Sequence, residues 1–295
     1  MPKIYKVFFT ISLILMAASL VLFLTYGLNL GIDFTGGALL EVKSNKLEAI
    51  NIRDSLEDLG VSNAVVSQTE GGFLIKMPEI SEVKHQEILS ELRKSDEIEE
   101  KRFDSIGSVL GAELKRKSVI AIVIALLLIS AYLAIVFSRI GGAISPLVLA
   151  LGAIVALIHD LLLPVGVFAW LGEFKGAAID APLIAAALAI LGYSINDTVV
   201  VYDRIRENII RDANIRIHTN DTNSFNQIVH KSVKQTLIRS INTTLTTLFA
   251  VIAIYVFGGP TLKNFSLALI IGIASGAYSS IFVASPILMF FHRKN

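Results

Sequence analysis

Six separate stretches of about twenty apolar residues constrain this sequence more than any other feature. About twenty residues of α-helix, at a rise of 1.5 Å each, cross the roughly 30 Å of hydrocarbon in a bilayer. The chain is 54% hydrophobic and 17% charged, with a mean hydropathy of +0.67, which is typical of bilayer proteins. We therefore expect a polytopic α-helical membrane protein with six transmembrane helices. The runs lie at residues 7–28, 118–137, 144–171, 181–202, 240–257 and 265–291.

The first run admits two interpretations, a cleaved signal peptide or an uncleaved anchor. Lys3 and Lys6 form a positive n-region, and Ala17-Ala18-Ser19 resembles a small-residue cleavage site. The apolar stretch nevertheless continues to Leu28, which is too long for the h-region of a signal peptide. The pattern therefore favours an uncleaved helix.

Net charge and cysteine content exclude several kinds of binding partner and chemical site. The formal net charge of +1 argues against nucleic acid as a partner. The chain has no cysteine, so it can form neither a disulfide nor a thiolate metal site, and it has no thiol nucleophile.

Lysine and arginine in the short loops predict which side of the membrane each loop occupies. They place both termini in the cytoplasm and residues 29–117 outside it. Lys115-Arg116-Lys117 argues the other way, but a long translocated domain is largely exempt from this rule. The expected organisation is 1–28 (N-terminus and first helix), 29–117 (outer domain) and 118–295 (helices two to six). The positive loops are the N-terminus, the link with Arg139, the cytoplasmic segment 203–239 and the tail 292–294.

The outer block 29–117 carries alternating strand and helix signals. Glu70-Gly71-Gly72 is a hairpin turn signal, and Ser81 can cap a helix. The order β-α-β-β-α-β predicts a small α+β ferredoxin-like domain between helices one and two. His85 stands alone on a charged helix, so we expect a solvated surface residue. The signals are strands at 37–42, 64–67, 73–77 and 99–105, with helices at 46–59 and 81–93.

The fourth run contains a carboxylate, Asp197, beside Asn196. An ionised carboxylate in a membrane helix costs a few kcal/mol, so it should face the bundle interior and have a partner. Tyr193 shares the helical stripe of Asp197. Arg239 begins the next, antiparallel helix at a similar depth, and the hydroxyls and amide of 242–247 follow it. We expect Asp197 to be functional and Arg239 to be its partner.

The third run contains a second polar pair, His159-Asp160. Adjacent helical residues point about 100° apart, which predicts that the two side chains face different grooves. Asp160 is the stronger candidate, because a neutral histidine tolerates burial better than a carboxylate. We interpret the serines and threonines of the apolar runs as contacts between helices. We interpret Gly272-x-x-x-Gly276, extended by Ser280, as a ridge of small residues for helix packing.

Four motifs together resemble the SecF family, subunits of the bacterial preprotein translocase in the RND-like SecD/SecF superfamily. They are GIDFTGG at 31–37, LIHD at 157–160, GYSINDTVVVYDRIREN at 192–208 and QTLIRSINTTLTTL at 235–248. The likeness covers essentially the whole chain. One position departs from the family pattern, since Ser108 stands where a proline is expected.

The resemblance implies a multi-pass protein of the bacterial cytoplasmic membrane that works with SecD, SecYEG and the translocating preprotein. It also implies that the proton motive force drives late translocation without a cofactor, and that the proton-relay aspartate and its arginine fall on Asp197 and Arg239. With Asp160, Asn196 and Tyr193 these residues form the candidate proton relay. No bond need be made or broken, so we do not expect an enzyme.

Two alternatives stay open at this point. Half of an RND-type proton-driven small-molecule exporter would also carry buried carboxylates and an outer domain, although RND outer domains are usually much larger. A purely structural membrane scaffold would tolerate neutralisation of Asp197.

Overall fold

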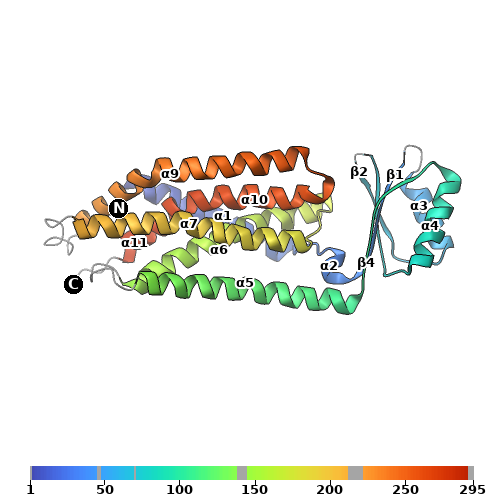
Figure 1. Cartoon of the computed structure of the whole chain (residues 1–295), viewed down its shortest axis with the longest axis horizontal. Coiled ribbons are helices and arrows are strands. Elements are labelled where there is room, and N and C mark those ends of the chain that lie inside the picture. The colour runs from blue at the N-terminus through green and yellow to red at the C-terminus, as the bar shows by residue number, and fades with distance from the viewer. Residues whose placement is uncertain (1, 45–47, 70, 138–144, 212–221, 292–295) are drawn as a thin grey trace. The chain divides into compact units, whose positions relative to one another are not determined.

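The computed structural model describes residues 2–44, 48–69, 71–137, 145–211 and 222–291 (Figure 1). Within these residues six helices are long and apolar enough to cross a membrane, which confirms the expected fold class. The chain divides into a helical unit (Met1–Leu28, Ala121–Ala177, Pro182–Asn295) and a smaller unit (Asn29–Ile120, Ala178–Ala181). The spanning helices are α1 (Lys3–Tyr26), α5 (Ser108–Val136), α6 (Pro146–Lys175), α7 (Ala181–Arg211), α9 (Thr222–Phe257) and α10 (Pro260–Ser279), the last continued by η1 (Ser280–Ala284) and α11 (Ser285–Phe291).

Several helices extend beyond their apolar runs. Helix α5 begins at Ser108 rather than near residue 118, and α7 continues to Arg211. Hydropathy marks only the part of a helix that hydrocarbon surrounds, whereas backbone hydrogen bonds continue into the polar flanks. Much of the segment 203–239 is therefore helical. Its residues 212–221, like Arg139 and the tail 292–295, lie outside the described part of the chain.

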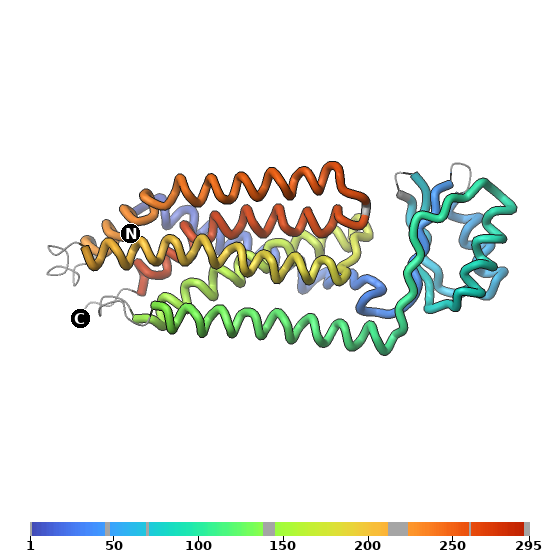
Figure 2. The backbone as a smooth tube through the Cα atoms, viewed as in Figure 1, coloured from blue at the N-terminus to red at the C-terminus, as the bar shows by residue number. Residues whose placement is uncertain are grey.

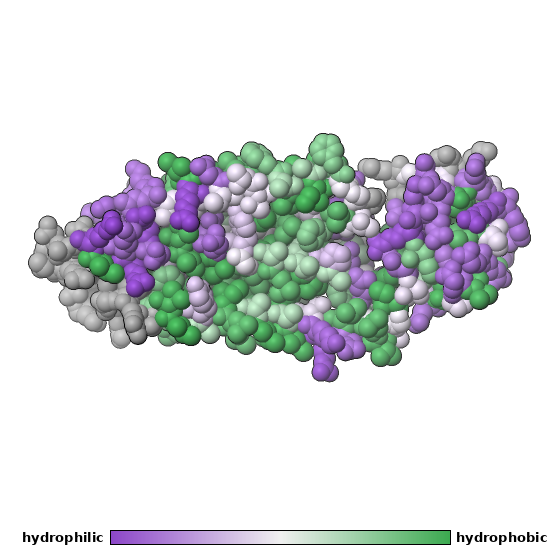
Figure 3. Space-filling model, viewed as in Figure 1, coloured by the Kyte–Doolittle hydropathy of each residue, from purple (hydrophilic) through white to green (hydrophobic). Residues whose placement is uncertain are grey.

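Helices α6 and α7 and the segment from α10 to α11 have the largest buried shares among the spanning helices, whereas α1, α5 and α9 expose apolar faces. Leu24, Leu127 and Phe249 are each more than 60% exposed, as lipid-facing side chains would be. Figure 3 shows apolar surface over the middle of this unit and hydrophilic side chains gathered where α7 ends and α9 begins. This distribution fits a bundle whose solvent is lipid.

The interior of the helical unit depends on small residues where helices meet. A Cβ at Gly152 of α6 would stand 2.6 Å from the Tyr202 hydroxyl of α7, and one at Gly272 of α10 would stand 2.3 Å from Ile190 of α7. The expected packing role of the Gly272–Gly276 ridge is therefore confirmed. The surrounding core includes Phe137, Phe225 and Leu288.

Helix α10 changes its hydrogen-bond pattern at η1, a single π-helical turn. Pro286 has no backbone N–H, so the normal i→i−4 bond to residue 282 cannot form there. The Ser285 hydroxyl donates to the Ser280 carbonyl oxygen within this turn, at 3.0 Å. Such turns locally loosen a helix and recur at functional sites.

The smaller unit contains a four-stranded antiparallel sheet of order β2-β3-β1-β4, which is the ferredoxin-like order. Figure 2 follows the chain through it, with both domain helices on one face of the sheet. Ile52, Leu56, Ile88 and Leu92 of those helices are buried against the sheet. The elements are β1 (Gly37–Lys43), α3 (Ala49–Asp58), β2 (Val65–Thr69), β3 (Gly72–Met77), α4 (Glu82–Ser95) and β4 (Glu99–Ile106).

Ser81 caps α4 as expected, since its hydroxyl accepts from the Lys84 backbone N–H at 3.3 Å. The expectation for His85 was wrong. Its side chain is only 2% exposed and stacks on Phe103 of β4, with ring centroids 3.7 Å apart. Its two ring nitrogens face Glu82 and Glu100. His85 lies three and seven residues before Ile88 and Leu92, on the same buried face of α4, so this helical spacing was the available signal.

The GIDFTGG segment forms the short helix α2 (Ile32–Thr35) and the entry to β1. Gly36 and Gly37 adopt φ values of +72° and +121°, which side chains disfavour. A Cβ at Gly36 would stand 2.6 Å from the Ser108 Cα. The same segment pairs with the loop before α7, because Gly31 N–H donates to the Ile179 carbonyl oxygen at 2.7 Å. Asp33 accepts from the Ala181 backbone N–H at 2.7 Å.

Candidate functional site

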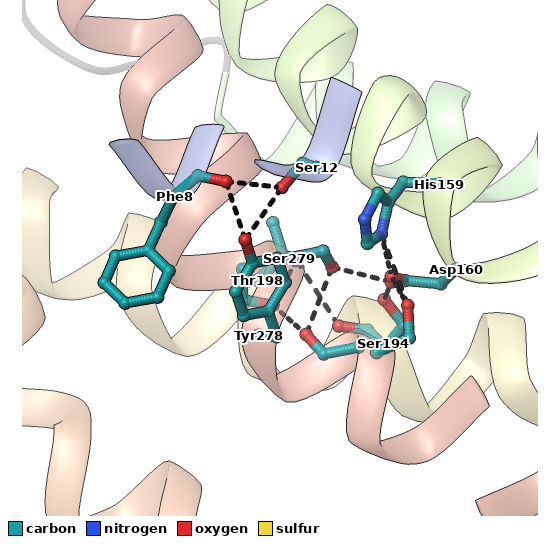
Figure 4. Close-up of polar contacts among 11 residues, drawn as sticks. Phe8, Ser12, His159, Asp160, Ser194, Thr198, Tyr278 and Ser279 are labelled. Atoms are coloured by element: carbon teal, nitrogen blue, oxygen red, sulfur yellow. Dashed lines mark hydrogen bonds and ion pairs between the residues drawn. The ribbon is translucent and has the colours of Figure 1, made fainter. Parts of the chain in front are cut away.

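Asp160 of α6 is fully buried and surrounded by hydrogen-bond donors (Figure 4). Ser275 of α10 donates to its Oδ1 at 2.7 Å, and Ser279 donates to its Oδ2 at 2.7 Å. Ser194 of α7 donates to the same Oδ2. One carboxylate thus joins α6, α7 and α10 at the middle of the helical unit.

His159, the preceding residue, faces the same groove. Its Nδ1 lies 2.9 Å from Asp160 Oδ1 and 3.3 Å from the Ser275 hydroxyl. The expectation that adjacent residues must face different grooves was wrong. The Cα–Cβ bonds diverge by about 100°, but the imidazole is long enough to turn back toward its neighbour. Its Nε2 is buried without a hydrogen-bond partner among the described residues.

A second group of hydroxyls connects this cluster to α1. The Tyr278 ring of α10 lies beside His159, with ring centroids 6.0 Å apart. Its hydroxyl donates to the Phe8 carbonyl oxygen at 2.6 Å and accepts from Ser12 at 3.2 Å (Figure 4). The hydroxyls beside α1 therefore adjoin the Asp160 cluster through this ring contact.

Asp197 of α7 is 3% exposed and faces α9 rather than α6. Thr244 donates to its Oδ2 at 3.5 Å, a long bond. Ser240 also lies near this carboxylate, and its buried hydroxyl has no other partner in the described part of the chain. Asp197 is therefore buried with far less hydrogen bonding than Asp160.

Arg239 is exposed on α9, one residue before Ser240. It lies close enough to attract the Asp197 charge, yet the described residues include no ion pair between the two. Its side chain lines a cavity of about 290 Å³ among α5, α7 and α9, together with Asp203, Arg204 and Gln235. The structure thus brings Arg239 near Asp197 without joining them.

The other two sequence candidates occupy different environments. Asn196 is exposed, so its side chain does not share the buried face of Asp197. Tyr193 is half-buried, and its hydroxyl has no hydrogen-bond partner among the residues described.

The sequence interpretation missed the serines that hold Asp160. Ser275 and Ser279 are four residues apart on α10, and Ser194 and Thr198 are four apart on α7; Thr198 bonds Ser280 at 2.8 Å. The i, i+4 spacing of small hydroxyl residues was the available signal. It did not say which carboxylate they would contact.

The comparisons with known proteins agree with this architecture. Residues 85–294 match the family model described as protein export membrane protein SecD/SecF, C-terminal, and residues 21–46 match the SecD/SecF GG motif. The chain is 39% identical to protein translocase subunit SecF of Thermobaculum terrenum, covering 98% of this chain and 92% of the relative. It is 36% identical to SecF of Haemophilus influenzae, covering 97% and 83% respectively.

Among solved structures, SecDF from Thermus thermophilus, a translocon-associated membrane protein, superposes with a TM-score of 0.82 at 32% identity. The alignment covers 97% of this chain and 38% of SecDF, so the chain spans well under half of that longer protein. SecDF in its super-membrane-facing form gives a TM-score of 0.66 at 31% identity. With the relatives above, these matches show that this multi-pass inner-membrane chain belongs to the SecF family of protein translocase subunits.

Proposed function

We propose that this chain couples the proton motive force to late steps of preprotein translocation, acting with SecD and SecYEG. Asp197 alternately holds and releases a proton, and the position of the Arg239 side chain determines whether Asp197 is protonated. Asp160, Asn196 and Tyr193 lie along the proposed proton path on α6 and α7. No cofactor takes part, no bond other than the O–H bond to the transferred proton is made or broken, and the chain is not an enzyme.

The observation that carries this proposal is the contrast between the two buried carboxylates. Four groups contact Asp160, whereas the contacts of Asp197 among the described residues are one long hydrogen bond from Thr244, with Ser240 nearby and Arg239 close but not ion-paired to it. A carboxylate buried with so few partners is costly to keep ionised, and an approaching guanidinium reverses that cost. A small movement of α9 against α7 would therefore switch Asp197 between its two protonation states.

The energy available is sufficient for mechanical work. Each elementary charge that crosses 100 mV releases about 2.3 kcal/mol, so a few protons supply several kcal/mol. In the proposed orientation both termini are cytoplasmic and the smaller unit lies outside the membrane, where it contacts the emerging preprotein. An RND-type small-molecule exporter is not favoured, because the curated relatives are named translocase subunits.

Replacement of Asp197 tests the proposal. Asp197→Asn keeps the size of the side chain but removes the titratable proton, so we expect normal assembly and loss of the gradient-dependent part of export. Asp54→Asn is the control, because Asp54 is an exposed aspartate of the smaller unit, outside the Arg239 cavity. Export is measured in membrane vesicles with and without a protonophore. Asp197→Asn vesicles that respond to the gradient like wild type would show that the carboxylate is structural.

A further inference from the structure

A groove of about 640 Å³ lies between α1 and α11 on the surface of the helical unit. It is found at the end of this unit where α1 begins and α11 ends (Figure 1). A groove of this volume is large enough to hold a small molecule. The side chains that line it include Lys6, Phe9 and Thr10 of α1 and Ile287, Phe290 and Phe291 of α11.

The walls of the groove are apolar. Phe290 and Phe291 are 80% and 61% exposed, so their rings require an apolar neighbour outside this chain. The Thr10 hydroxyl donates to the Lys6 carbonyl oxygen of its own helix at 2.9 Å, which leaves no O–H group for a ligand. An apolar chain therefore fits the body of the groove.

One end of the groove is positively charged. Lys6 is exposed there, and it takes part in no ion pair within the described part of the chain. Neither α1 nor α11 contains an aspartate or a glutamate. The N-terminus of α1, which no side chain caps, adds the positive end of the helix dipole. An anionic group is therefore favoured beside Lys6.

We propose that this groove binds one anionic phospholipid, with the phosphate on Lys6 and an acyl chain along Phe9, Ile287 and Phe290. A cation above an apolar cleft between membrane helices is the arrangement that binds anionic headgroups. Interfaces between membrane helices are instead rich in small residues, and Thr10 is the one small side chain in the described lining. A lipid chain thus fits better than a partner helix. The cytoplasmic leaflet as the source of the lipid rests on the proposed orientation, but the site itself does not.

Native mass spectrometry of the full-length chain in detergent tests the charge requirement. Phosphatidylglycerol and zwitterionic phosphatidylcholine with the same acyl chains are titrated separately, and we expect one phosphatidylglycerol to be retained in preference. Lys6→Gln should lower its affinity about fivefold. Lys175→Gln is the control, because Lys175 is an exposed lysine beside Phe174, which contacts Tyr26 at the far end of α1. Equal retention of the two lipids by wild type, or equal losses in the two variants, would overturn the proposal.

A second pair of variants tests the groove while Lys6 stays in place. Thr10→Trp should fill the groove and lower phosphatidylglycerol binding at least as far as Lys6→Gln does. Ile14→Trp is the matched control, since Ile14 is 62% exposed one turn further along α1 and does not line the groove. Both substitutions replace exposed side chains, and equal melting temperatures in lipid-free detergent check that both variants fold. Wild-type binding by Thr10→Trp would show that charge alone attracts the lipid, and the groove assignment would fail.

Crosslinking in native membranes identifies the occupant. A benzophenone amino acid in place of Thr10 should form an adduct with the mass of a phospholipid after irradiation. An adduct with another polypeptide would show that a protein covers the groove, and it would overturn the proposal. None of these measurements depends on the Asp197 mechanism, so the lipid site and the proposed function succeed or fail separately.

Discussion

Gly166 of α6 lies directly against Ser19 of α1: a Cβ at Gly166 would stand 2.5 Å from the Ser19 Cα. The neighbouring atom is backbone, so it cannot turn aside as the end of a flexible side chain can. Close approach of this kind is how membrane helices gain packing energy, since lipid supplies no hydrophobic drive between them. Helix α1 therefore belongs to the packed bundle.

Gly166→Ala should destabilise the helical unit by about 1–3 kcal/mol, because the added methyl group forces α1 away from α6. Gly192→Ala on α7 is the control, since a Cβ there meets no atom within 4 Å. Denaturant unfolding in detergent measures both. Equal stability of the two variants would contradict the close approach.

Ser275→Ala and Ser279→Ala should each cost about 1–3 kcal/mol, because each leaves one position of the buried Asp160 carboxylate unsatisfied. Ser266→Ala is a matched control on the same helix: Ser266 is fully buried but donates to carbonyl oxygens of its own helix. Thermal unfolding in detergent compares the three. If Ser266→Ala were as damaging as the other two, loss of volume rather than loss of the Asp160 contacts would explain the effect.

Arg239→Ala should abolish gradient-driven export, because Asp197 without a nearby cation tends to keep its proton. Arg239→Lys should retain part of the activity, since the charge survives while the planar donor geometry is lost. Lys234→Ala, an exposed cation on the same helix, serves as the control. Vesicle export with an imposed pH gradient is the measurement, and undiminished export by Arg239→Ala would remove the arginine from the mechanism.

Single cysteines at Glu57 and Lys231 should react from opposite sides of the membrane. The native chain has no cysteine, so each label reports one position, and both side chains are exposed. In intact cells an impermeant maleimide should modify position 57 and leave position 231 unmodified until the cells are opened. Labelling of both positions in intact cells would refute the proposed orientation.

Residues 37–106, expressed alone, should fold cooperatively and lose stability in acid. Hydrogen bonds from Gln86 and His85 hold the pKa of Glu82 below its usual range. A depressed folded-state pKa stabilises the fold above the unfolded value of 4.5, and this contribution is lost as the pH falls through the folded value. Glu82→Gln should flatten the acid limb of the stability curve, measured by urea unfolding across pH. Glu91→Gln on the same helix should leave that limb in place.

The sequence alone determined that lipid surrounds the helices, how many helices span the membrane, and the order of strands and helices in the outer domain. A run of about twenty apolar residues is a local property that burial in lipid imposes directly. Alternation of apolar and polar residues over five or six positions is likewise imposed by burial of one face of a sheet. For the same reason Asp197 could be identified as unusual from its position in an apolar run. The family resemblance carried by the four motifs was likewise a property of the sequence, and the comparisons confirmed it.

Only the tertiary structure decided which side chains meet. His85 stacks on Phe103 because β4 covers its helix, and His159 joins Asp160 because its ring turns back into the groove of α10. Ser275 and Ser279 contact Asp160 from more than a hundred positions away in the chain. The periodicity of apolar residues shows which face of a helix is buried. It does not show which helix packs against that face, how far the two are shifted along their axes, or which rotamers their side chains adopt. Those depend on packing among distant segments, which is why the charged clusters of this bundle could not be assembled from the sequence.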